Sequence, residues 1–433
     1  ISTLRKGEFS MEKVKLAIIG TGLRGAYTYA PLIAKYKDKC EIVAFVENKK
    51  GRRDLFLEKY PVDKDMVFDN LNDFIAHDKL ADAVIISHYD LLHYDTAQVL
   101  LVKGYDVLVE TPVANSLDGL VHLKEYSLKN KDRLFMVAYN NRYSSFYTKL
   151  KEIVDDKKLG DLINISYNVD IGYQNFVHNY VRGNWRITSD TATIMLTNSC
   201  QDIDMMINLS KGKCQKVSCF SDLRIFNWEN FNTKMSENCF RCSEEESCPF
   251  SAKKIYLQED KLINNSVHIN PTKDNLEAIL KQGPYGKCVF YCDNDVCDNL
   301  TSIFKFDNKV TSNFNINAFT KESDKKIRLF FKEGEVEASF KQKEIKIKSF
   351  LNTDEKIIKI DQENTDEKLF VDFIDRVKNK NYKSCISDVG SVIESHVATF
   401  AAEFANVSET VVDVKLFFDD AVEMTRQIEK MMF

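Results

Sequence analysis

The chain has 433 residues, of which 44% are hydrophobic and 29% charged, and this composition excludes a disordered protein or a coiled coil. Its 60 Lys and Arg residues are balanced by 65 Asp and Glu residues, so it lacks the basic surface of a nucleic-acid-binding protein. No apolar run approaches the roughly 20 residues of a membrane span, so we expect small molecules as partners, with neither nucleic acid nor a membrane.

The first ten residues are expected to be a leader that lies outside the fold. Ile1 to Ser10 precede the first methionine, Met11, and the apolar segment that follows has no signal-type apolar region before it. We therefore predict a cytoplasmic protein. The remaining length is too great for one core and fits two domains.

A glycine-rich turn follows the first apolar segment, in the sequence VKLAIIGTGLRG. Gly20, Gly22 and Gly25, with Leu23 and Arg24 between them, have the spacing of a dinucleotide-binding turn. The glycines allow the tight turn and the close approach of a pyrophosphate, while the helix N-terminus offers free N–H groups to the phosphates. The spacing predicts a strand, a turn and a helix that bind a dinucleotide.

The next apolar segment, CEIVAFVE, ends at Glu47. A carboxylate at this point accepts hydrogen bonds from the adenosine ribose hydroxyls and repels a 2'-phosphate, so we expect NAD rather than NADP. Four basic residues follow directly, either as phosphate ligands or as a solvated helix start: Lys49, Lys50, Arg52 and Arg53.

Alternating segments continue the pattern with LADAVIIS, HYDLLHYDTAQVLLVKG and YDVLVE, which predict a strand, a helix and a strand of a parallel α/β sheet. Ligands of such sheets bind beyond the carboxyl ends of the strands. Four polar side chains are expected there: His88, Asp90, His93 and Glu110. For His93 the alternative is a helix-start histidine bonded to the backbone.

Several motifs, in this order and spacing, resemble the Gfo/Idh/MocA family of oxidoreductases: GTGLRG, LADAVII with HYDLLHYDTA, GYDVLVETP, YVRGNWR with SCQDID, GPYGKCVFYCDNDV, and ESHVATFAAE. The resemblance spans Met11 to Val414. It implies a doubly wound Rossmann domain, followed by an α/β domain whose large, mostly antiparallel open sheet forms the substrate pocket and often an oligomer interface.

We therefore predict an NAD-binding domain over 11–135 and a substrate and oligomerisation domain over 136–433, with a cysteine-rich insertion at about 225–298. Alternating apolar and polar residues after position 308 predict the antiparallel strands of that second domain. A homo-oligomer, either a dimer or a tetramer, is expected.

The resemblance also exposes departures at the site of proton transfer. Family members carry lysine before Pro112, beside the nicotinamide, where this chain has Thr111. Asn198 and Gln201 stand in place of lysine and histidine, whereas Asp204 matches. Threonine and amide groups hydrogen-bond a sugar hydroxyl, but they carry no proton near neutral pH.

Replacement proton carriers are sought among polar residues of the second domain. The candidates are Tyr139, Tyr173, Tyr180, His178 and Asp204. A tyrosine in this role needs a nearby cation to lower its pKa, and the sequence offers Arg182 or Arg186; the alternative for each tyrosine is an aromatic wall against a sugar. Trp185 and Arg186 resemble a family stretch that lies against the cofactor, although Trp185 alternatively closes the domain junction.

Three cysteines lie close together in the sequence NCFRCSEEESCPF: Cys239, Cys242 and Cys248. A structural zinc ion takes four soft ligands, so we predict a zinc site completed by Cys292, with Cys288 and Cys219 as alternatives. Reduced thiols without a metal are the other interpretation.

The sequence predicts an NAD(P)-dependent oxidoreductase that acts on a sugar, polyol or related hydroxy compound by hydride transfer, with a non-standard proton carrier. The competing hypothesis is an inactive NAD-binding protein that serves as a sugar sensor or as a partner of an active protein. A third is elimination with transient reduction of NAD, which also needs a base.

Overall fold

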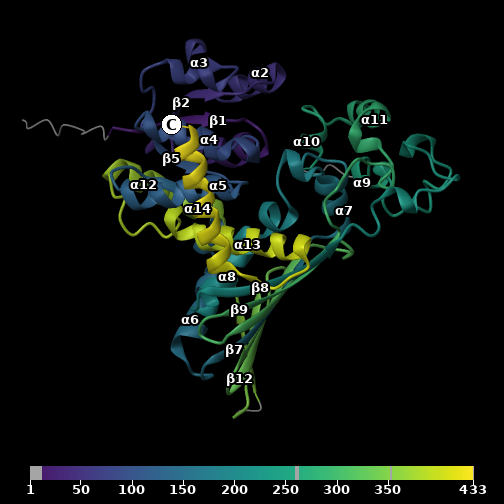
Figure 1. Cartoon of the computed structure of the whole chain (residues 1–433). Helices are drawn as coiled ribbons and strands as arrows, with labels where there is room; N and C mark the ends of the chain where they lie inside the picture. Colours follow the sequence, from purple (N-terminus) through teal and green to yellow (C-terminus); the bar gives the residue numbers. More distant parts are fainter. Residues whose placement is uncertain (1–11, 259–262, 352–353, 433) are drawn as a thin grey trace, which may run out of the picture.

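Two β-sheets organise the chain, as the computed structural model in Figure 1 shows. The structure describes residues 12–258, 263–351 and 354–432, so the leader expected at 1–10 lies outside the described residues. Within the described ranges, no helix is long and apolar enough to cross a membrane.

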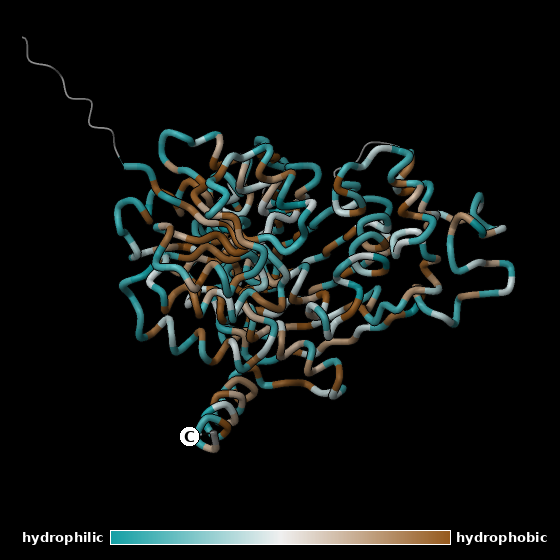
Figure 2. The backbone as a smooth tube through the Cα atoms, turned by 90° about the horizontal axis from the view of Figure 1, so that it is seen from above, coloured by the Kyte–Doolittle hydropathy of each residue, from teal (hydrophilic) through white to brown (hydrophobic). Residues whose placement is uncertain are grey.

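The first sheet is parallel and has six strands in the order β3-β2-β1-β4-β5-β6, as expected for a doubly wound dinucleotide-binding domain. Its strands β1, β4, β5 and β6 consist almost entirely of buried residues, because helices cover both faces. Figure 2 shows this hydrophobic layer. The strands are β1 (Val14–Ile19), β2 (Cys40–Val46), β3 (Val67–Phe68), β4 (Ala83–Ile86), β5 (Asp106–Val109) and β6 (Phe135–Val137).

Helices connect these strands. The helix after β1 starts with a π-helical turn, η1 (Gly25–Tyr29), and continues as α1 (Ala30–Lys35). The others are α2 (Lys50–Lys59), η2 (Lys64–Met66), α3 (Leu71–Ala76), η3 (Asp90–Leu92), α4 (His93–Val102) and α5 (Leu117–Lys129). Because the order reverses at β1, the turn after β1 lies at the switch point where such sheets bind ligands.

The second sheet has nine strands in the order β14-β13-β12-β11-β7-β10-β9-β8-β15, and all of its pairs except β10 with β7 are antiparallel. Buried and exposed residues alternate in β9, which shows that helices cover only one face. The strands are β7 (Leu162–Asp170), β8 (Cys214–Asp222), β9 (Asn299–Phe306), β10 (Thr311–Asn317), β11 (Asp324–Phe331), β12 (Gly334–Ser339), β13 (Glu344–Ser349), β14 (Glu355–Lys359) and β15 (Val412–Asp413).

The helices of this second part are α6 (Ser145–Asp156), α7 (Tyr173–Phe176), α8 (Ile194–Ser210), α13 (Val389–Ser408) and α14 (Val414–Met432). Short turns η4 (Asn140–Tyr143), η5 (Val177–Val181) and η6 (Thr188–Asp190) join them to the strands. The antiparallel strands and these helices follow the apolar patterns seen in the sequence, and the predicted fold class is confirmed.

The first domain also takes a helix from near the C-terminus. Helix α12 (Thr365–Asn379) buries Leu369, Phe370, Phe373 and Ile374 in one cluster with residues of β1, β2 and β4. The expected boundary at 135 falls at the start of β6, so the first sheet extends slightly beyond it.

The cysteine-rich insertion lies between β8 and β9 and is mostly loops and short helices, visible in Figure 1 to the side of the second sheet. It contains η7 (Trp228–Asn230), η8 (Cys239–Arg241), α9 (Ala252–Tyr256), α10 (Asn264–Val267), α11 (Lys273–Gln282) and η9 (Pro284–Gly286).

Shortening Phe370 tests the docking of α12. The side chain is fully buried, so Phe370→Ala is expected to lower the free energy of unfolding by about 3–5 kcal/mol. Urea denaturation followed by circular dichroism measures this loss. Lys368→Ala, at an exposed position of the same helix, should change stability by no more than about 0.5 kcal/mol. Equal effects of the two substitutions would contradict the docked position of α12.

Candidate active site

The glycine-rich turn has the backbone geometry that a dinucleotide needs. Gly20 has a φ of +92°, and a Cβ there would lie 2.7 Å from the backbone of His88. A Cβ at Gly25 would lie 2.1 Å from the carbonyl oxygen of Gly20. Around Gly22, by contrast, a Cβ would meet only Arg52 Nη1, at 3.8 Å. The turn therefore leaves open space at the glycine that a pyrophosphate approaches, and the residues present fit the cofactor.

Glu47 lies where β2 ends and is bonded to the same turn. Its Oε2 accepts hydrogen bonds from the backbone N–H and the hydroxyl of Thr21, at 3.0 and 3.1 Å, and its Oε1 accepts one from Lys49 N at 2.9 Å. Each carboxylate oxygen accepts two hydrogen bonds, so Oε1 keeps one acceptor site that suits a ribose hydroxyl.

The four basic residues after Glu47 are not equivalent. Lys50 pairs with Asp54 at 2.7 Å, and Arg53 donates to the carbonyl oxygens of Glu47 and Asn48. Arg52 is the member of this group whose guanidinium lies beside Gly22. It is therefore the one placed to meet a phosphate.

Two histidines lie beyond the carboxyl end of β4 and are held by the backbone. His93 contacts the carbonyl oxygens of Pro112 and His88, at 2.8 and 3.2 Å. His88 contacts the hydroxyl of Thr96 at 2.9 Å, and burial lowers its pKa to about 4. His88 is therefore neutral at physiological pH, and the helix-start interpretation of His93 agrees with its contacts.

Asp90 follows the same strand and is nearly buried. Its Oδ2 accepts a hydrogen bond of 2.6 Å from Trp185 Nε1, which joins the first domain to the segment after η5. Tyr89 strengthens this junction by donating to the carbonyl oxygen of Asn184 at 3.0 Å. Burial raises the pKa of Asp90 above its ordinary value. Trp185 thus closes the domain junction and also touches a titratable group of the site.

Glu110, at the end of β5, is paired with the glycine-rich turn. It accepts a hydrogen bond from Arg24 Nε at 2.7 Å and one from the hydroxyl of Tyr29. Arg24 also pairs with Asp366 of α12 at 2.8 Å, and Asn140 donates to the same carboxylate at 2.9 Å. The first turn of α12 therefore completes a network around the glycine-rich turn.

Thr111 and Pro112 belong to a loop that α13 anchors. His396 Nε2 accepts a hydrogen bond from Val113 N at 3.2 Å, and His396 Nδ1 lies 3.1 Å from the hydroxyl of Tyr139. Tyr139 is fully buried and also contacts Ser395 Oγ at 3.0 Å. Burial raises the pKa of Tyr139 far above its ordinary value, so this tyrosine supports the loop rather than carrying protons.

Tyr180 reaches the site from η5. Its side chain hydrogen-bonds the side chains of Thr197 and Asn198 of α8, and the charge of Asp90 acts on it. Burial raises the pKa of Tyr180 to about 12, and the two hydrogen bonds oppose this rise. A neutral tyrosine, an amide and a buried carboxylate thus occupy one junction beside the carboxyl ends of β4 and β5.

Other candidates are engaged elsewhere. Gln201 accepts from Asn141 N at 3.2 Å and donates to Ala138 O at 3.3 Å, so it joins α8 to the segment after β6. Asp204 forms a bidentate ion pair with Arg142, at 2.8 and 2.5 Å. These side chains hold the fold together, and neither is available as a free base.

Three further candidates contact the insertion. His178 lies between the hydroxyls of Tyr256 and Ser266, at 3.1 and 2.9 Å. Tyr173 packs edge-on against Phe250, with ring centroids 6.1 Å apart. Arg186 pairs with Asp293 at 2.9 Å, and this pairing binds the insertion rather than a pyrophosphate.

The zinc site stays a prediction. Burial raises the pKa of Cys248 and of the alternative ligand Cys288, and Cys239 and Cys242 lie close enough to both thiols to raise it further. Among the described residues, no group of three or more His, Cys, Asp or Glu side chains is arranged to hold a metal ion. The cation beside Cys239 is the buried guanidinium of Arg182, whose Nη2 lies 3.4 Å from Sγ. Cys292 instead donates to the carbonyl oxygen of Cys288 at 3.2 Å, and burial raises the pKa of Cys292 to about 11. Cys242 and Cys248 are partly exposed, and Cys219 lies in β8.

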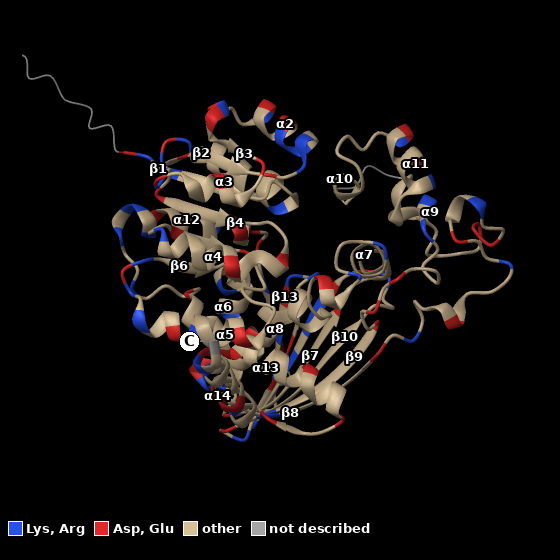
Figure 3. Cartoon of the chain, turned by 45° about the horizontal axis from the view of Figure 1, so that its top comes forward, with Lys and Arg blue, Asp and Glu red and all other residues tan. Residues whose placement is uncertain are grey.

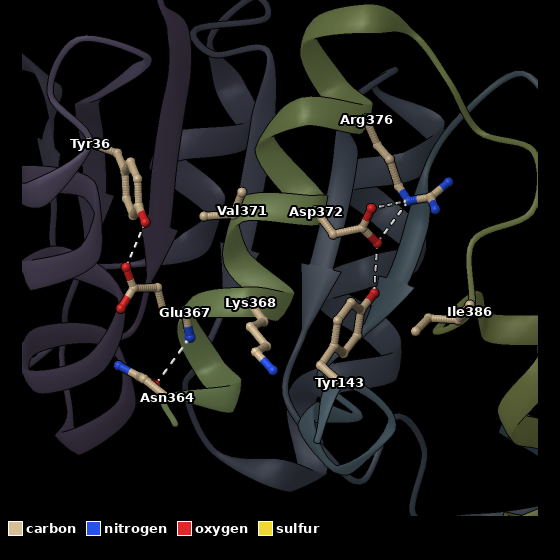
Figure 4. A pocket seen from close by; sticks show the side chains of 9 residues that line it. All are labelled: Tyr36, Tyr143, Asn364, Glu367, Lys368, Val371, Asp372, Arg376 and Ile386. Carbon is tan, nitrogen blue, oxygen red and sulfur yellow. Dashed lines mark hydrogen bonds and ion pairs between the residues drawn. The ribbon is translucent and has the colours of Figure 1, made fainter. Parts of the chain in front are cut away.

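A surface cavity of about 700 Å³ lies over α12, away from these strand ends. Figure 4 shows polar groups of its lining bonded to one another, Tyr36 to Glu367, and Tyr143 and Arg376 to Asp372. Lys368 pairs with Glu363, outside the lining. Because these groups satisfy each other, the cavity is a less suitable ligand site than the junction at Asp90 and Tyr180.

Comparison with known proteins agrees with this geometry. Residues 14–139 match the sequence profile of the Gfo/Idh/MocA oxidoreductase family with its NAD-binding Rossmann fold. An inositol 2-dehydrogenase of Salmonella paratyphi B is 26% identical over 194 residues, which are 42% of this chain and 56% of that protein. A scyllo-inositol 2-dehydrogenase (NADP(+)) of Bacillus subtilis is 25% identical over 193 residues, covering 44% and 50%.

The matched part thus spans about half the length of these curated relatives. An oxidoreductase of Thermotoga maritima has the same fold over nearly the whole chain: the TM-score is 0.68 at 18% identity, and 94% of this chain and 100% of the other are covered. Together with the glycine-rich turn and the six-stranded parallel sheet, the match over residues 14–139 shows that this part of the chain is similar to the NAD-binding Rossmann domain of the Gfo/Idh/MocA oxidoreductase family.

Proposed function

We propose that the protein is an NAD-dependent oxidoreductase that transfers a hydride to or from a sugar, polyol or related hydroxy compound. The observation that carries the proposal is the meeting of Tyr180, Asn198 and Asp90 at the strand ends of an intact dinucleotide-binding domain. The names of the inositol dehydrogenases that the chain resembles support a polyol as the substrate class.

The chain's own residues account for binding and for proton transfer. The amide of Asn198 and the hydroxyls of Thr111 and Thr197 suit a ligand rich in hydroxyl groups, since each both donates and accepts hydrogen bonds. Tyr180, with a pKa of about 12, stays protonated and donates to the reacting oxygen. Asp90 is the carboxylate of the site that takes the proton released on oxidation. A bound nicotinamide would supply the hydride-transfer chemistry of the site.

NAD is the proposed cofactor because Glu47 stands at the end of β2, where its charge repels a 2'-phosphate. Arg52 lies beside Gly22, and we assign it to the pyrophosphate. A cytoplasmic location stays a prediction.

One set of contacts favours the inactive NAD-binding alternative. Gln201 and Asp204 are engaged in structural bonds, and Thr111 makes no hydrogen bond through its side chain to any residue that the structure describes. A protein with this site that only senses a sugar would bind NAD and sugar without turnover.

Replacing Tyr180 by phenylalanine separates the two functions. The native protein is expected to reduce NAD with at least one member of a panel of inositols, sugars and sugar acids. Tyr180→Phe should lower kcat by about 10²- to 10⁴-fold, because the hydroxyl that donates a hydrogen bond to the reacting oxygen is lost. Tyr94→Phe, on the outer helix α4, is the matched control and should keep full activity. Calorimetric titration with NAD and NADP tests cofactor binding separately. Tight NAD binding without turnover would support the sensor, and tighter binding of NADP would contradict the cofactor assignment.

The pH dependence of oxidation tests Asp90. Burial raises its pKa above the ordinary value of 3.8, and the proposed mechanism uses the carboxylate form. The kcat for oxidation is therefore expected to fall as the pH drops through that raised pKa. Asp90→Asn should remove this acidic limb and lower kcat by about 10²- to 10⁴-fold, whereas Asp95→Asn, on the exposed side of α4, should leave the profile unchanged. An acidic limb that persists in Asp90→Asn would exclude Asp90 as the proton acceptor.

We also propose a homo-oligomer, a dimer or tetramer, that forms through the open face of the nine-stranded sheet. Phe220 and Ile303 expose 66% and 56% of their surface there, in adjacent strands β8 and β9. Sedimentation velocity of the full chain is expected to show a dimer or tetramer that Phe220→Asp with Ile303→Asp dissociates. A monomeric native protein would contradict this proposal.

A further inference from the structure

The cysteine-rich insertion reaches the first domain. A groove of about 500 Å³ lies between the glycine-rich turn, α2 and the insertion, which contributes Asn265 and Ile269. A Cβ on Gly51, in α2, would contact Ile269 Cδ1 at 3.6 Å. Figure 3 shows α10 of the insertion opposite α2. Residues more than 200 positions apart thus line one groove.

The lining of this groove combines aromatic, cationic and amide groups. Tyr27, Phe56 and Tyr60 supply aromatic surface, while Thr21, Gly22 and Leu23 belong to the turn. Arg52 and Lys59 supply positive charge, and Glu58 is the carboxylate among the lining residues. An aromatic base attached to phosphate has matching chemistry, since the ring packs on apolar surface and the phosphate pairs with a guanidinium.

The segment Asn264–Ile269 is held in place by residues of the second domain. His178 Nε2 lies 2.9 Å from Ser266 Oγ, and its Nδ1 lies 3.1 Å from the hydroxyl of Tyr256. The imidazole also stacks on Tyr285, with centroids 5.2 Å apart. Because Ser266 is adjacent to Asn265, these contacts fix the position of the segment beside the groove.

Arg182, which follows the last residue of η5, makes a second attachment to the insertion. Its buried guanidinium donates to the carbonyl oxygens of Lys287 and Phe250, at 2.8 and 2.9 Å. These two bonds attach the insertion to the second domain on either side of the segment Asn264–Ile269. The part of the insertion that lines the groove is therefore held in place by His178 and Arg182.

We propose that the insertion forms part of the cofactor site: Asn265 and Ile269 cover the adenosine half of the bound dinucleotide, and His178 is a positioning residue for that cover. The inference rests on the proposed function, since it presupposes that NAD binds at the glycine-rich turn. It assigns His178 a role in cofactor affinity and none in proton transfer.

The test compares NAD+ binding by the full-length native protein and the double variant Asn265→Ala/Ile269→Ala, using titration calorimetry. Removing the cover exposes apolar surface of the bound nucleotide, so the Kd for NAD+ should rise about 10-fold. Lys273→Ala, an exposed substitution in α11 of the same insertion, should leave Kd within about two-fold of native. An unchanged Kd in the double variant would overturn the inference while leaving the proposed function intact.

Hydrogen exchange of the native protein gives a second readout that needs no substitution in the groove. NAD+ is expected to slow exchange of the amides at 264–269, and His178→Ala should speed their exchange and weaken NAD+ binding together. Binding of NAD+ without protection of these amides would overturn the inference. If the native protein binds no NAD+ at all, the proposed function fails as well, and that result is distinct from a loss confined to the variants.

Discussion

The ion pairs of Arg24 hold together the three segments on which the site depends. Its guanidinium contacts Glu110 at the end of β5 and Asp366 at the start of α12, each within 2.8 Å. The glycine-rich turn, the strand end that precedes Thr111 and a helix from the far end of the chain are thereby fixed to one another. A partly buried cation between two carboxylates is stabilised because each partner offsets the desolvation of the others. The position of the glycine-rich turn therefore depends on contacts with α12, near the C-terminus, as well as on the strands of the first sheet.

The organisation of the first domain was predictable because its signals are local. The strand before Gly20, the turn and the carboxylate at Glu47 occur within about 30 residues and obey rules of spacing. The same holds for the alternating residues of the antiparallel strands. By contrast, the partners of Tyr139 and His178 were not predictable, because the sequence distances are 257 residues to His396 and 88 to Ser266. Residue type suggested chemistry for both, whereas burial and neighbours give them structural roles.

The cysteine cluster shows what spacing leaves open. Cys239, Cys242 and Cys248 have ligand-like intervals, but the intervals do not reveal which cation lies among the side chains. In the structure Arg182 brings a buried positive charge to Cys239, and Cys292 turns to a backbone carbonyl. From the sequence alone, Arg182 is a candidate cation for lowering the pKa of a tyrosine. The pKa values of the side chains at a site depend on such neighbours in three dimensions. A single sequence does not show which residues these neighbours are.

The substitutions at the proton-transfer positions have different physical consequences. Gln201 both donates to Ala138 O and accepts from Asn141 N, two bonds that a side-chain amide makes at once. That position has become part of the framework. Asn198 instead faces Tyr180, and a lysine there would place a cation beside a tyrosine that burial keeps neutral. An amide in place of the lysine removes this charge. Asp90 is then the carboxylate that we propose as the proton acceptor. Under the proposed function, the site is rebuilt around a carboxylate and a neutral tyrosine; in the inactive alternative, the same amides serve only to bind the ligand.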